Sequence, residues 1–114
     1  MAQSTPIVPV DVAALVAEAA RAAFDGAEGP GPRLVLVPPP GTVVTDGERV
    51  RGVLVNLLQN ARESIAAAGR GGPDAVEVGA RRLAGGRVVL WVQDRGPGVA
   101  PGDLPHVFEP YFTT

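Results

Sequence analysis

Two asparagines and a glutamate recur at helical spacing near the middle of the chain, and their side chains could bind a ligand. Asn56, Asn60 and Glu63 stand at i, i+4 and i+7, so a helix places them in one polar stripe about 100° from the centre of the apolar face. Asparagine is a mediocre helix former because its amide competes for backbone hydrogen bonds. Two asparagines one turn apart therefore need a reason, and either a solvated helix face or a ligand-binding face would supply one.

A carboxylate follows the most apolar segment of the chain. Asp94 comes directly after residues 87–93, and Gly96 and Gly98 then allow the backbone to turn and to approach a ligand without a Cβ in the way. An ionised carboxylate at this place can accept a hydrogen bond from an amino group. The alternative is an ordinary turn, since Asp, Gly and Pro are the commonest turn formers. The segment is not a phosphate loop, because the chain contains no G-x-x-x-x-G-K-[ST] motif and no lysine.

An aromatic cluster lies close to the last residue. Phe108, Tyr111 and Phe112 are three of the five aromatic residues of the chain. They could anchor a terminal loop to the sheet or form part of a loop over a binding site. The two interpretations are compatible, because a loop over a site must also be anchored.

Length and composition limit the class of protein. The chain has 114 residues, of which 46% are hydrophobic, and this suits one small globular domain. A net charge of -2 without a basic stripe argues against nucleic acid as a partner. The absence of cysteine and the presence of a single histidine, His106, exclude thiolate chemistry and multi-histidine metal sites. No apolar run approaches the ~20 residues that span a bilayer, and we expect a cytoplasmic domain.

The elements that must position these side chains follow from hydrophobic spacing and turn signals. We expect a helix over residues 11–24 with Asp11 as N-cap, a short buried strand over 33–37 and an extended segment over 42–44. Thr45 and Glu48 have the spacing of a capping box that starts a long helix, which Gly69 ends. The apolar face of that helix is expected to comprise Val50, Val53, Leu54, Leu57, Leu58, Ala61 and Ile65.

The second half of the chain reads as a hairpin followed by irregular structure. Residues 75–81 and 87–93 are rich in β-formers and are joined through Gly85 and Gly86, which predicts an antiparallel pair whose second strand is central. A single helical turn is expected over residues 103–107, with His106 in a loop or turn. The order of elements predicts a two-layer α+β sandwich, with helices on one face of a mixed sheet.

Taken together, three segments resemble the nucleotide-binding motifs of one known family. Residues 56–61 (NLLQNA), 94–98 (DRGPG) and 108–114 (FEPYFTT) are similar, in order and spacing, to the asparagine box, first glycine box and phenylalanine box of the histidine kinase ATP-binding domain. That domain belongs to the Bergerat superfamily, with the gyrase, heat-shock chaperone and mismatch-repair ATPases. The chain looks most like kinases of the nitrogen-regulation type, which often carry a glutamate where Glu63 stands, whereas many other members carry a basic residue there.

The resemblance implies one Bergerat-type domain over residues 1–114 that is incomplete at its C-terminal end. In the family, a lid, a second glycine box, a helix and further strands follow the phenylalanine box. We therefore expect the isolated chain to be inactive and either marginally stable or homodimeric.

The resemblance also implies ATP and Mg²⁺ as cofactors and assigns roles to particular residues. Asn60 would ligate Mg²⁺, Asn56 and Glu63 would face the site of catalysis, and Asp94 would accept a hydrogen bond from the adenine amino group. Asn56 also counts among the nucleotide contacts. The remaining nucleotide contacts implied are Gly96, Gly98, Val99, Phe108, Thr113 and Thr114.

The implied reaction is transfer of the γ-phosphoryl group of ATP to a histidine on a separate dimerisation domain, with a response regulator as the next partner. His106 is not expected to be that acceptor, since it lies beside the aromatic segment and not on a long helix. Two alternatives remain: a non-catalytic half-domain that acts as an interaction module, and a serine kinase of the anti-sigma type, against which the phenylalanine box argues. Any membrane attachment of a full-length protein would lie outside this chain.

Overall fold

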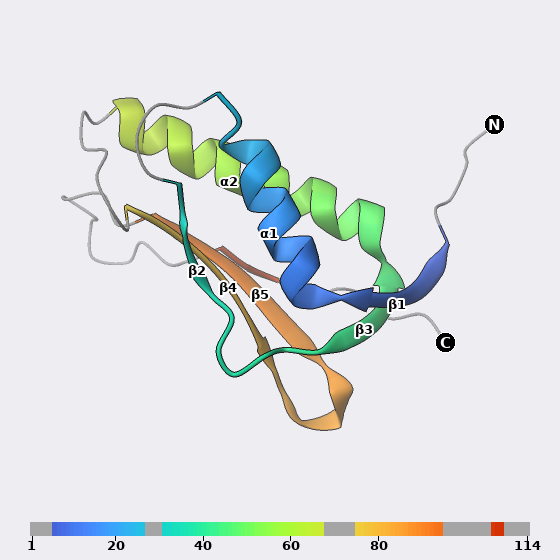
Figure 1. Cartoon of the computed structure of the whole chain (residues 1–114). Helices are drawn as coiled ribbons and strands as arrows, with labels where there is room; N and C mark the ends of the chain where they lie inside the picture. The colour runs from blue at the N-terminus through green and yellow to red at the C-terminus, as the bar shows by residue number, and fades with distance from the viewer. Residues whose placement is uncertain (1–5, 27–30, 68–74, 95–105, 109–114) are drawn as a thin grey trace.

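Two helices pack side by side on one face of a mixed sheet (Figure 1). The computed structural model describes residues 6–26, 31–67, 75–94 and 106–108. In chain order the elements are β1 (Ile7–Asp11), α1 (Val12–Ala23), β2 (Arg33–Val35), β3 (Thr42–Asp46), α2 (Gly47–Ala67), β4 (Val76–Arg82), β5 (Val88–Asp94) and β6 (His106–Phe108), with a short 3₁₀ turn at Ala84–Gly86. This confirms the two-layer α+β sandwich.

Helix α1 begins where the sequence predicts. The Asp11 carboxylate accepts a hydrogen bond from the Ala14 backbone N–H at 3.4 Å, so the first turn has a partner for one of its free donors. The buried face consists of Val12, Leu15, Val16, Ala19, Ala20 and Ala23. Small alanines at these positions let α1 lie close to α2 and to β4.

Helix α2 is also confirmed, but its cap differs from the prediction. Thr45 is still part of β3 and is only 2% exposed, and the Asp46 carboxylate accepts the Arg49 N–H at 3.2 Å. The capping box of Thr45 and Glu48 is therefore wrong, because strand pairing with β1 continues to Asp46 and leaves that residue as the cap.

The buried face of α2 is narrower than predicted. Its buried residues are Val50, Leu54, Leu58, Ala61 and Ile65. Leu57 is half-buried and packs against the core, whereas Val53 is 42% exposed, which corrects the assignment of Val53 to the buried face. Both lie on one side of the apolar stripe, where no described helix packs against them.

The sheet has the strand order β2-β4-β5-β6, and β1 pairs separately with β3. The predicted antiparallel hairpin of β4 and β5 is confirmed, as is the interior position of β5. Residues paired across antiparallel strands lie on the same face of the sheet. The face toward the helices therefore carries Val76, Val78, Ala80, Val88, Leu90 and Val92, all of them buried.

Three further details differ from the prediction. The segment after Arg33 is an edge strand with Leu34 42% exposed, so it is not buried; it pairs on one side only, with β4. His106 lies in strand β6 opposite Val92, where a helical turn or loop was expected. Strand β1 was not predicted from the sequence; it contains Pro9 and pairs with β3.

Among the described residues, no helix is both long enough and apolar enough to cross a bilayer.

Candidate functional site

The side of α2 that carries the asparagines is the side away from α1. Arg62 of α2 donates a hydrogen bond from Nη1 to the Ala23 carbonyl oxygen at the end of α1, at 3.1 Å. Asn60 precedes Arg62 by two residues, and two residues turn an α-helix by about 200°. Asn60 therefore faces away from α1, toward the half of the molecule where α2 packs over β5.

Asn56 and Glu63 point further from the sheet than expected. Asn56 is two residues from both Leu54 and Leu58, so it stands on the opposite side of the helix from the buried face. The three stripe residues, Asn56, Asn60 and Glu63, are all exposed. The whole stripe therefore lies on the exposed side of α2, away from the buried face.

Both asparagine amides are available to a ligand. Neither side chain forms a hydrogen bond with another described residue. An exposed amide in a helix interior, without a bond to the backbone, lowers helix propensity and gives no compensating stability within the described fold. This favours the ligand-binding interpretation of the stripe.

Asp94 lies on the same face of the sheet as the helices. It pairs with Val76 at the end of β5 and follows Val92 by two residues, so it continues the buried row that packs beneath α2. Figure 1 shows β5 running from the hairpin turn toward the end of the sheet where the last turns of α2 lie. Asp94 is half-buried, and its carboxylate forms no hydrogen bond or ion pair with any described residue.

Asn60 thus lies on the exposed side of α2 that faces away from α1, and Asp94 lies at the end of β5, on the sheet face that carries the helices. Gly96, Gly98, Val99, Thr113 and Thr114 lie outside the described residues. For Phe108 the structure gives only its place in β6, opposite Leu90 of β5. That pairing brings the start of the aromatic segment to the strand that carries Asp94.

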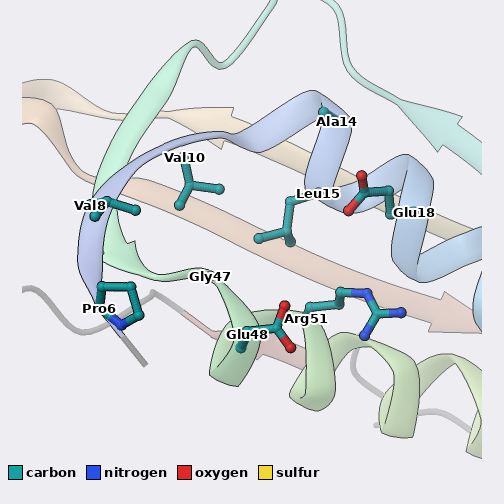
Figure 2. A pocket seen from close by; sticks show the side chains of 9 residues that line it. All are labelled: Pro6, Val8, Val10, Ala14, Leu15, Glu18, Gly47, Glu48 and Arg51. Carbon is teal, nitrogen blue, oxygen red and sulfur yellow. The ribbon is translucent and has the colours of Figure 1, made fainter. Parts of the chain in front are cut away.

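A pocket of about 320 Å³ lies elsewhere, between β1, α1 and the first turn of α2. Figure 2 shows the apolar side chains of Val8, Val10 and Leu15 lining it, with charged side chains at the seam between the helices. One of these, Arg51, precedes Asn60 by nine residues, about two and a half helical turns, and so faces the opposite way. The pocket and the predicted nucleotide residues are therefore on different sides of α2.

No described group of three or more histidine, cysteine, aspartate or glutamate side chains is arranged to hold a metal ion. A metal at this site would depend on amide oxygens, water and the oxygens of a bound ligand.

Trp91 and Gly79, to which no role was assigned from the sequence, lie together on the outer face of the sheet. The two residues pair across β4 and β5, and the Trp91 Nε1 donates a hydrogen bond to Oε2 of Glu77 at 3.0 Å. A glycine in the interior of a strand was the available signal, because it often marks a close approach of another group.

Comparison with known proteins identifies similar sequences. The family model described as histidine kinase-, DNA gyrase B- and HSP90-like ATPase matches residues 45–114. The chain is 43% identical over 72 residues to the sensor histidine kinase ZraS of Salmonella typhimurium, which covers 63% of this chain and 14% of that protein. It is 40% identical over 78 residues to the C4-dicarboxylate transport sensor protein DctB of Rhizobium meliloti, covering 67% and 12% respectively.

A third relative is the C4-dicarboxylate transport sensor protein DctS of Rhodobacter capsulatus, 39% identical over 72 residues, covering 63% of this chain and 11% of that protein. The chain thus spans less than a fifth of the length of each of these relatives.

Proposed function

The chain belongs to the family of histidine kinase-, DNA gyrase B- and HSP90-like ATPases, and from this premise we propose that it binds Mg-ATP as the catalytic domain of a two-component sensor histidine kinase. The observation that carries the proposal is the half-buried carboxylate of Asp94 beneath α2, which has no partner among the described residues. Burying a carboxylate without a partner is unfavourable, so a ligand that donates a hydrogen bond there is stabilised.

Asp94 recognises the base in this proposal. The exocyclic amino group of adenine donates a hydrogen bond to the carboxylate, and a bond to a charged acceptor is stronger than one between neutral groups. We propose Gly96, Gly98 and Val99 as contacts beside the base, and Phe108, Thr113 and Thr114 as further nucleotide contacts.

Asn60 would hold the phosphate end of the nucleotide through a bound Mg²⁺. A side-chain amide oxygen is a hard ligand that suits Mg²⁺, which commonly keeps several waters and shares its remaining positions with phosphate oxygens. The exposed, unbonded amide of Asn60 fits this role. The metal would supply neutralisation of the phosphate charge. Asn56, one turn earlier on α2, orients the same phosphate groups. Glu63 faces the side from which the acceptor histidine approaches.

The reaction we propose is phosphoryl transfer to a histidine on a separate dimerisation domain. The bond between the γ-phosphorus and the β–γ bridging oxygen breaks, a bond to an imidazole nitrogen forms, and ADP leaves. The residues of this chain act mainly by positioning the nucleotide, as is usual for phosphoryl transfer. A response regulator is then the partner that receives the phosphoryl group.

Base selectivity tests the proposal directly. Guanine carries a carbonyl oxygen where adenine carries the amino group, so the Asp94 carboxylate would face an acceptor and lose its hydrogen bond. We expect calorimetric titration to give binding of Mg-ADP that is at least about tenfold tighter than binding of Mg-GDP. Equal affinity for the two nucleotides, or binding of neither, would contradict the proposed base recognition.

A further inference from the structure

We infer that Trp91, Gly79 and Glu77 form a clamp on the outer face of the sheet that positions Asp94 for the nucleotide. The inference rests on the proposed function of Asp94. The three residues make no contact with the proposed site, because their side chains lie on the face opposite to the one that carries Asp94. They are positioning residues that act through strand β5.

The indole ring of Trp91 lies over Gly79 so closely that only glycine fits there. A Cβ added at Gly79 would stand 2.6 Å from Cε2 and 2.8 Å from Cη2 of Trp91. The ring is rigid and is held in place by the hydrogen bond from its Nε1 to Glu77, whose residue is only 7% exposed. The Trp91 ring, the Gly79 backbone and the Glu77 carboxylate therefore hold one another in place.

The inner face of the hairpin does not specify its register well. Val76, Val78 and Ala80 of β4 lie opposite Asp94, Val92 and Leu90 of β5, and these rows are mostly small aliphatic residues. A slip by two residues would keep aliphatic side chains facing the helices, since the alternation of a strand has a period of two. Burial alone therefore discriminates poorly between registers.

The outer face does specify the register. A two-residue slip would place Trp91 opposite Glu77 or Arg81, where a long side chain occupies the space that Gly79 leaves free. The clamp therefore works together with the turn at Gly85 and Gly86 to hold β5 in one position along β4. Asp94 is three residues from Trp91 on the same strand, so its place beneath α2 depends on that register.

Gly79→Ala tests the clamp with a single methyl group. The added Cβ displaces the indole ring and breaks its bond to Glu77, and because Trp91 is the only tryptophan of the chain its fluorescence reports the displacement. We expect faster hydrogen exchange at the amides of residues 92–94 and a loss of Mg-ADP affinity of about fivefold. Trp91→Phe, which keeps a ring over Gly79 but lacks the donor, should give a smaller change in the same direction.

The matched control is Val16→Ala in α1, a fully buried position on a helix that packs against α2 and β4. All variants are compared well below their melting temperatures, so general loss of stability is separated from loss of position. The clamp is overturned if Gly79→Ala and Val16→Ala change Mg-ADP affinity equally, or if exchange at residues 92–94 is unchanged in Gly79→Ala. Failure of the wild-type chain to bind Mg-ADP overturns the proposed function and its link to the clamp, while the exchange rates separately decide whether the clamp holds the strand.

Discussion

At the scale of single residues, the site depends on side chains that have no partner within the described fold. Asn60 is exposed on α2, and Asp94 is half-buried at the end of β5, on the sheet face that carries the helices. Neither contributes a hydrogen bond to stability in the described structure. Substituting them should therefore change binding far more than folding.

The role of Asn60 can be tested through the metal. With Asn60→Ala, we expect the ratio of ADP affinity in Mg²⁺ to that in EDTA to fall toward one, because the amide oxygen that binds the metal is lost. Gln59→Ala is the control, since it removes a neighbouring amide from the same turn but from a different side of the helix. A metal dependence that is unchanged in Asn60→Ala would rule out this residue as a ligand.

The residue scale was also where the sequence could predict least. Asn60 and Asp94 stood out by type and spacing, but Trp91 and Gly79 look unremarkable until the register of β4 and β5 is known. Contacts across strands depend on pairing, which a linear pattern does not contain. Asn56 and Glu63 were assigned correctly to a helix, yet their distance from the core depends on which neighbours bury that helix.

At the scale of elements, periodic patterns predicted the helices and the hairpin, whereas boundaries and edges were less certain. The error in the cap of α2 arose because two residues in succession, Thr45 and Asp46, are both good caps. Pairing with β1 extends β3 to Asp46 and selects the second. The apolar residues after Arg33 predict a buried strand, but residue types alone do not reveal that this strand lies at the edge of the sheet.

The cap of α2 makes a prediction at this scale. Asp46→Ala should lower the free energy of unfolding by about 1 kcal/mol, since the Arg49 N–H loses its acceptor. Glu48→Ala should cost less than about 0.5 kcal/mol, because Glu48 is exposed and takes no part in the observed cap. Urea unfolding of both variants measures the two losses in free energy of unfolding. A larger loss for Glu48→Ala than for Asp46→Ala would support the capping box of Thr45 and Glu48 and contradict the Asp46 cap.

The buried face of α2 makes a second prediction. Leu54→Ala should destabilise the chain by about 2–5 kcal/mol, because Leu54 is completely buried between the helix and the sheet. Val53→Ala is the neighbouring control, and its effect should be below about 1 kcal/mol since the residue is 42% exposed. Similar losses of stability for Leu54→Ala and Val53→Ala would mean that the side of α2 that carries Val53 is buried as well.

At the scale of the whole molecule, one arginine links the hairpin to the segment that leads into β3. Arg82 at the end of β4 donates from Nε to the Pro40 carbonyl oxygen at 2.8 Å and from Nη2 to the Thr42 carbonyl oxygen. These bonds span the loop between β2 and β3, so they join the four-stranded sheet to the β1–β3 pair. The two sheets and the two helices thereby act as one support for the site.

Weakening the bonds of Arg82 should lower the stability of the fold without changing the residues of the proposed nucleotide site directly. Arg82→Lys, which lacks the planar fork, should lower stability by about 1–3 kcal/mol, because charge-assisted bonds to two carbonyl oxygens are lost or weakened. Arg81→Lys, at an exposed neighbouring position, is the matched control. Thermal melting gives the comparison, and equal melting temperatures for the two variants would contradict the structural role of Arg82.

The central claim is that Asp94 binds the adenine of a nucleotide held against α2, and calorimetric titration with Mg-ADP tests it most directly. Asp94→Asn replaces the acceptor by an amide of the same shape, whereas Asp25→Asn makes the same change at an exposed position at the end of α1. We predict that Asp94→Asn weakens Mg-ADP binding by at least about tenfold and that Asp25→Asn leaves it unchanged. An affinity for Mg-ADP that is the same in Asp94→Asn as in the wild-type chain would contradict the account.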